Sequence, residues 1–176
     1  MRMLLFARRP VAGAAAALAL GLLAATSLAA PPLHLGPFPY IYEGPMMGPD
    51  GQPIVCNVQP IQERTAWEDR LTFFYDKEGK RIRLQVHTRG TSVFINPDTG
   101  TEARATAGWQ TTEKTPYDGS KYVGLFYHVV LPGVGVIMQD AGLQIYNWDS
   151  PEPVVKRAGT YQWNLTDYDE FCAAMQ

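Results

Sequence analysis

Few side chains in this sequence could carry chemistry, and three of them form the candidate binding set: Asp69, Trp109 and His128. Asp69 shares strand parity with Trp67, so we expect it to be partly buried among apolar neighbours. A buried carboxylate needs a hydrogen-bonding or cationic partner. That partner is either Arg64 or an inward hydroxyl; in the alternative interpretation, Asp69 is an acid or base in a pocket.

The three histidines, His34, His87 and His128, lie far apart in the sequence and show none of the spacings of a metal site. We therefore predict no metal and no cofactor. The sequence also lacks a G-x-S-x-G elbow, a glycine-rich loop that opens a helix, and an HExxH motif. No catalytic residue is assigned, and the absence of these motifs favours a protein that is not an enzyme.

The N-terminal segment has the organisation of a secretory signal peptide. Three arginines precede an apolar run over residues 11–25, and Ser27 and Ala29 supply a small-x-small cleavage pattern. Residues 1–29 are therefore predicted to be removed, leaving a secreted or extracellular protein. The apolar run is shorter than the roughly 20 residues that a spanning helix needs, so no membrane span is expected after cleavage.

Cleavage would change the charge of the chain. Three of the 15 Lys and Arg residues lie in the leader and no acid does, so 12 basic residues remain against 17 acidic ones. This mildly acidic balance argues against a nucleic-acid partner and against docking on anionic lipid. An unknown small ligand or a protein is the expected partner.

Cys56 and Cys172 are the two cysteines of the sequence. Exported proteins meet an oxidising environment, and an even pair there is interpreted first as a disulfide. The bond would tie the first ordered strand to a C-terminal helix. A reactive or metal-bound thiol is the less favoured alternative, because the sequence has no CxxC motif and no histidine near either cysteine.

The elements that must position these residues follow a period of two. Residues 30–53 are rich in proline and glycine and are predicted to be an arm or spacer, whose aromatics could alternatively pack on the domain or on a partner. From residue 54 to 176 apolar residues alternate between recurrent turn signals, including one at Asp140–Gly142. Trp109 and three alanines point inward on one strand, and residues 122–148 are apolar on both faces. Tyr168, Phe171, Cys172 and Met175 have helical spacing after a possible N-cap at Thr166.

This pattern predicts an all-β fold, an antiparallel meander of about eight strands forming a barrel with a short C-terminal helix. A two-sheet sandwich is the alternative. Residues 54–176 would form this single β domain.

Several stretches resemble small secreted actinobacterial proteins of unknown function. They are Gly124–His128 through Pro132-Gly133, Val136–Gly142 and Phe171-Cys172-Ala173-Ala174, together with the hairpin at Phe73–Gly79 and the turn at Asn96–Gly100. The resemblance covers roughly Cys56 to the C-terminus. It implies an exported single-domain architecture, and it supplies no catalytic residue.

The function favoured by the sequence is a non-catalytic extracellular module that binds a small apolar ligand or a protein partner. The two-sided apolar strands and the small inward alanines motivate this hypothesis. One alternative is a secreted enzyme that uses Asp69 and a histidine as an acid–base pair in a barrel pocket. A structural component of the cell envelope is another.

Overall fold

The computed structural model describes residues 30–48, 50–115, 119–150, 154–162 and 168–176. The predicted signal peptide at 1–29 and the possible N-cap Thr166 lie outside these residues. In the described part, seven strands are followed by one short helix: β1 (Leu33–Pro45), β2 (Gln62–Tyr75), β3 (Arg81–Ile95), β4 (Glu102–Lys114), β5 (Gly119–Leu131), β6 (Gly135–Asn147), β7 (Val154–Tyr161) and α2 (Asp169–Ala174).

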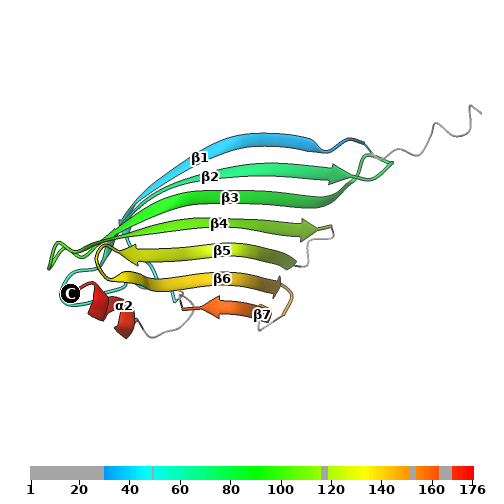
Figure 1. Ribbon diagram of the computed structural model, residues 1–176. Coiled ribbons are helices and arrows are strands. Elements are labelled where there is room, and N and C mark those ends of the chain that lie inside the picture. Colours follow the sequence, from blue (N-terminus) through cyan, green and yellow to red (C-terminus); the bar gives the residue numbers. More distant parts are fainter. Residues whose placement is uncertain (1–29, 49, 116–118, 151–153, 163–167) are drawn as a thin grey trace, which may run out of the picture.

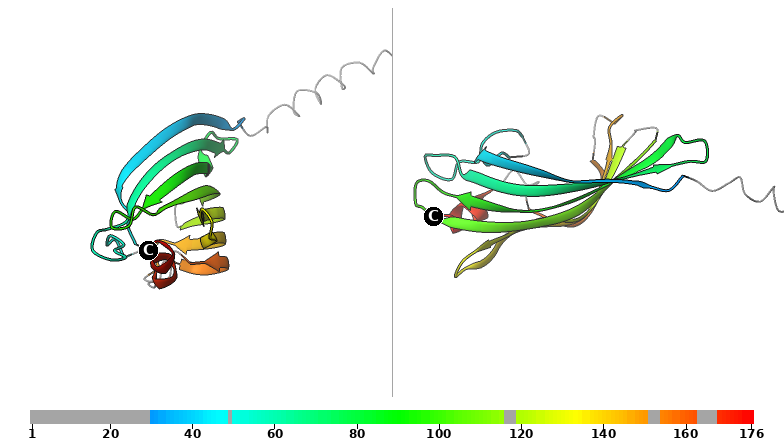
Figure 2. Two further views of the ribbon diagram at one scale, coloured as in Figure 1. Left: turned by 60° about the vertical axis from the view of Figure 1, so that its left-hand side comes forward. Right: turned by 90° about the horizontal axis from the view of Figure 1, so that it is seen from above.

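The strands pair antiparallel in chain order and form one sheet (Figure 1). The predicted all-β antiparallel meander with a short C-terminal helix is thus confirmed. The sheet is strongly curved, but β1 and β7 remain apart as its two edges (Figure 2). The predicted barrel is therefore not confirmed. The described strands do not form a two-sheet sandwich either, because all seven belong to the same sheet.

The proline-rich segment contributes the first strand of this sheet. The sequence predicts a spacer over residues 30–53, whereas Leu33–Pro45 pairs with β2 along its length. Proline lacks a backbone N–H and is tolerated on an edge strand, where one side has no neighbouring strand. The spacer interpretation is corrected accordingly, and the aromatics of this segment belong to the sheet.

β6 runs without a break through Asp140–Gly142, where the sequence predicts a turn. Gly142 has a φ of 140° and faces Gly159, whose φ is 129°, on β7. A Cβ atom at Gly142 would lie 2.1 Å from the carbonyl oxygen of Ala158. The glycines therefore let two backbones approach closely while the strands continue, so one strand stands where two were expected.

The core lies at one end of the sheet, where α2 and the segment 46–61 pack against the strands (Figure 1). The ring of Phe171 on α2 meets the ring of Phe94 on β3 at 6.2 Å and 90°. Burying a side chain such as Phe171 contributes about 1.5–3 kcal/mol. We call the face of the sheet that carries Phe94 the helix-side face. The buried apolar residues of this core are Met46, Ile54, Ile61, Phe94, Ala103, Ala105, Val129, Leu131, Met138, Phe171 and Met175.

The predicted disulfide between Cys56 and Cys172 is present and joins the segment 46–61 to α2. The amide of Asn96 donates a hydrogen bond to the carbonyl oxygen of Met175 at 3.0 Å. A six-residue helix is too short to be stable on its own. The helix therefore depends on the disulfide, on the Asn96 hydrogen bond and on the burial of Phe171.

Candidate functional site

Asp69 and Trp109 lie in one row across three strands, with Thr88 between them. Thr88 is the cross-strand partner of Asp69 on β2 and of Trp109 on β4. Directly paired residues of an antiparallel sheet point to the same face, so all three side chains belong to the helix-side face. The Thr88 hydroxyl donates to Asp69 Oδ1 at 2.6 Å. Asp69 thus pairs with an inward hydroxyl, one of the expected partners, and Arg64 lies on the opposite face beside Glu43.

Trp109 is part of a continuous series of aromatic rings on the helix-side face. Its ring meets Trp67 edge to face, with centroids 4.9 Å apart. Such pairs contribute about 0.5–1.5 kcal/mol beyond their area burial. The series connects the core to the far part of the sheet. In order, its rings belong to Phe171, Phe94, Tyr127, Trp67, Trp109, Phe126 and Tyr161.

Buried acids surround the middle of this series. The hydroxyls of Thr65 and Ser92 donate to Glu63 Oε1 at 2.6 and 3.2 Å. Burial raises the pKa of Tyr127 well above its ordinary value, with smaller contributions from the negative charges of Glu63 and Asp140. Tyr127 therefore stays protonated at neutral pH, and its phenol fits a packing role better than that of a base.

The three histidines do not approach Asp69. His34 pairs with Thr72, His87 with Arg70 and His128 with Thr106, all at positions that alternate with the helix-side residues. They therefore lie on the opposite face of the sheet, and His128 is separated from Asp69 and Trp109. The acid–base pair of the enzyme alternative is not formed, because its two members point away from each other.

β1 carries an exposed row of large apolar side chains on the helix-side face. Leu33, Leu35, Phe38 and Tyr40 are 46%, 41%, 49% and 56% exposed, and their cross-strand partners on β2 are helix-side residues. The half-buried Leu71 and Phe73 extend the row inward. We call these six residues the apolar patch. It lies on the half of the sheet that points away from α2 (Figure 1).

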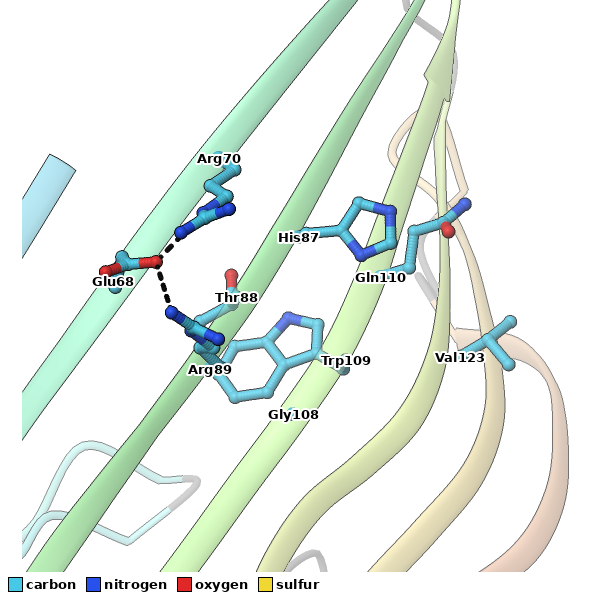
Figure 3. Close-up of a pocket in the computed structure, with 9 residues that line it drawn as sticks. All are labelled: Glu68, Arg70, His87, Thr88, Arg89, Gly108, Trp109, Gln110 and Val123. Carbon is cyan, nitrogen blue, oxygen red and sulfur yellow. Dashed lines mark hydrogen bonds and ion pairs between the residues drawn. The ribbon is translucent and has the colours of Figure 1, made fainter. Parts of the chain in front are cut away.

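The opposite face carries a groove of about 590 Å³. Arg70 and Arg89 stand on either side of Glu68 there, and both are bonded to its Oε1, at 2.9 and 3.1 Å (Figure 3). His87 and Gln110 continue the wall on β3 and β4, while Gly108 contributes no side chain. We call this the basic groove; Thr88, Trp109 and Val123 also border it.

Charge is divided between the two faces of the sheet. At the paired positions of the described strands, basic side chains outnumber acids on the opposite face and acids prevail on the helix-side face. The opposite face carries Arg64, Arg70, Arg83, Arg89, Arg104, Lys114, Lys121 and Lys156 with Glu43, Glu68 and Glu102. The helix-side face carries Glu63, Asp69, Glu113 and Asp140 with Arg157 and Arg81, the latter over the ring of Phe73.

Sequence patterns missed both surfaces. The patch was hidden by the prolines of β1, which argue against a strand, although Leu33 and Leu35 already alternate. The groove depends on register, since Arg70 and Arg89 are 19 positions apart and meet only when β2 and β3 pair. The alternation of basic residues around His87 was the available signal for a polar face.

The described ranges contain no group of His, Cys, Asp and Glu side chains that could hold a metal ion. Within the same ranges, no helix is long and apolar enough to cross a membrane. No family model, curated protein or solved structure matches this chain. The geometry of the two faces is therefore the basis for assigning a function.

Proposed function

We propose that this chain is a non-catalytic, exported binding module that holds a small apolar ligand against the apolar patch. The observation that carries the proposal is the row Leu33, Leu35, Phe38 and Tyr40, which exposes large apolar side chains side by side. Scattered apolar residues are normal on a protein surface, but a contiguous patch marks an interaction site.

The surroundings of the patch suit a ligand with one polar end. Phe38 stands directly opposite Asp69, whose carboxylate is held by Thr88. An apolar body on Leu33, Leu35 and Phe38 would place its polar end near this carboxylate and hydroxyl. Small-molecule sites have this composition, mostly apolar walls with a few fixed polar groups.

The disulfide supports the exported location in this proposal. Disulfides persist in oxidising compartments and are rare in the cytosol. The bond between Cys56 and Cys172 fits a protein that functions outside the cytoplasm. Catalysis is not part of the proposal, because Asp69 has no histidine on its own face at the paired positions of the described strands.

The test is a titration with N-phenyl-1-naphthylamine, a neutral apolar probe whose fluorescence rises in apolar surroundings. We expect the mature protein to bind it, and the double variant Leu35→Ser with Phe38→Ser to bind at least about tenfold more weakly, since each lost contact costs about 1 kcal/mol or more. Ile41→Ser is the matched control, because Ile41 is on the same strand, 75% exposed and on the opposite face.

The control should bind the probe within about twofold of the wild-type protein, a difference of less than about 0.5 kcal/mol. Equal weakening by Ile41→Ser would show general adhesion of the probe to exposed apolar side chains. Absence of binding by the wild-type protein would contradict a small-ligand site and would favour a protein partner on the patch.

A further inference from the structure

The basic groove has a built shape, apart from the apolar patch and on the other face of the sheet. Gly108 leaves its floor free of side chains, and the nearest atom to a Cβ added there is 4.0 Å away. Arg70, Arg89, His87 and Gln110 stand around this floor (Figure 3). A hollow of about 590 Å³ can hold a ring with its substituents.

The two arginines of the groove are held in place before any ligand arrives. Glu68 accepts from Arg70 Nε and from Arg89 Nη2, so one carboxylate oxygen fixes both guanidinium groups. Each guanidinium has five N–H donors in a planar fork, and these contacts use one nitrogen of each. The remaining donors match the oxygens of a carboxylate. Because Glu68 orders the side chains, a ligand loses less entropy in binding them.

The groove does not end at Arg70 and His87. A second hollow of about 370 Å³ shares these two residues and is also lined by His34 and Thr72, whose Nδ1 and Oγ1 are 3.0 Å apart. Donors and acceptors thus continue from β4 across β3 and β2 to β1. Two adjoining hollows suit a chain of linked units better than a single small anion.

The polar groups along this track favour sugars. Histidine, threonine and glutamine side chains can each exchange hydrogen bonds with hydroxyl groups, and the arginines supply charge. Single-stranded nucleic acid would need exposed aromatic rings for base stacking. Trp109 borders this groove, but strand register and its contact with Trp67 place its ring on the helix-side face. The ring of Phe74, on the groove's face, is covered by the Arg83 guanidinium at 3.8 Å.

From these observations we infer that the basic groove is a second binding site, which takes the carboxylate groups of an acidic polysaccharide. The mildly acidic charge of the whole chain conceals this surface, because at the paired positions of the described strands this face carries eight basic side chains and three acids. The site is independent of the apolar patch, so neither proposal needs the other.

The experiment is a calorimetric titration of the mature protein with uronate oligosaccharides prepared from alginate, with dextran as the neutral polymer. The double variant Arg70→Gln with Arg89→Gln removes two charges from the groove. Arg64→Gln with Arg104→Gln removes two charges from the same face away from it. Gly108→Leu fills the floor of the groove without changing its charge. Because the space around Gly108 is open, we expect this variant to fold even if the arginine double variant does not.

We expect the uronate to bind and dextran not to bind. The groove double variant and Gly108→Leu should each weaken binding at least tenfold, and the matched double variant less than threefold. No binding by the wild-type protein would overturn the inference. So would equal losses in the two double variants, which would indicate diffuse attraction, or binding of a single-stranded DNA oligonucleotide at least as tightly as the uronate.

Discussion

Asp98 connects two segments that are distant in the sequence. Its Oδ2 accepts hydrogen bonds from the backbone N–H groups of Val58 and Gln59, at 2.8 and 3.0 Å. These bonds to Gln59 and Val58 lower the pKa of Asp98 below its ordinary value. The carboxylate form therefore stabilises the fold above the pKa of an unfolded aspartate, and this contribution is lost as the pH falls through the lowered pKa.

We predict that Asp98→Asn lowers the free energy of unfolding at pH 7 and that the difference from the wild-type protein shrinks toward zero as the medium is acidified. Urea unfolding followed by fluorescence at several pH values measures both. Asp149→Asn is the control, since Asp149 is exposed and its carboxylate has no hydrogen bond among the contacts described. A constant difference between pH 7 and pH 2 would refute the role of the charged form.

The sequence correctly predicted which face a side chain occupies where the residues of a strand alternate without a bulge. β4 pairs with β3 without a shift, and Ala103, Ala105 and Trp109 all point to the helix side as predicted. In β5, a bulge between Leu125 and Tyr127 adds a residue, so Tyr122 and Tyr127 reach the same face despite opposite parity. Bulges are set by backbone geometry across strands, and one sequence does not reveal them.

The glycines of β6 and β7 determine how closely these two strands approach each other. We predict that Gly142→Ala destabilises the protein by about 3 kcal/mol or more, because the new Cβ both strains a backbone at positive φ and meets a carbonyl oxygen. Gly133→Ala is the matched control. Its φ is also positive, at 82°, but a Cβ there has open space, so a cost near 1 kcal/mol is expected.

Chemical denaturation of the two glycine variants provides the measurement. Equal destabilisation by both would mean that conformational strain, and not the close approach of β6 and β7, decides the cost. The same glycines explain why the turn predicted at Asp140-Ala141-Gly142 is absent, since this sequence has turn composition but lies in a continuous strand. Asp and Gly are typical of turns, but here they also lie within a continuous strand.

At the scale of the whole molecule, the disulfide closes a loop of most of the domain, since its cysteines have a sequence separation of 116. The chain-entropy model gives roughly 4–5 kcal/mol for a loop of this size, as an upper figure. We predict that the double variant Cys56→Ser with Cys172→Ser loses stability of this order in urea unfolding. Adding reductant should lower the stability of the wild-type protein and leave the variant unchanged.

An unchanged midpoint in the double variant would show that the burial of Phe171 and the Asn96 contact hold α2 in place without the disulfide. The pairing was predictable because an even pair of cysteines permits one intramolecular bond. Closure of the sheet was not predictable in the same way. The six sequential connections between seven antiparallel strands are compatible with an open or a closed sheet. The difference depends on whether β1 and β7 meet, which local patterns do not encode.

The division of chemistry between the two faces is a property of the whole sheet. The composition of the chain is mildly acidic. The register of the strands, however, places most basic side chains on one face and most aromatic and acidic ones on the other. The apolar patch and the basic groove exist only after this sorting. Their residues come from strands that the sequence alone does not align.

Native mass spectrometry of the protein purified from its own culture medium tests the central proposal most directly. We predict that the folded wild-type protein carries a small apolar molecule, which is released on unfolding. The double variant Leu35→Ser with Phe38→Ser, purified in parallel, should carry none or much less of it. Bare wild-type protein, or equal occupancy in the two proteins, would contradict a ligand site on the apolar patch.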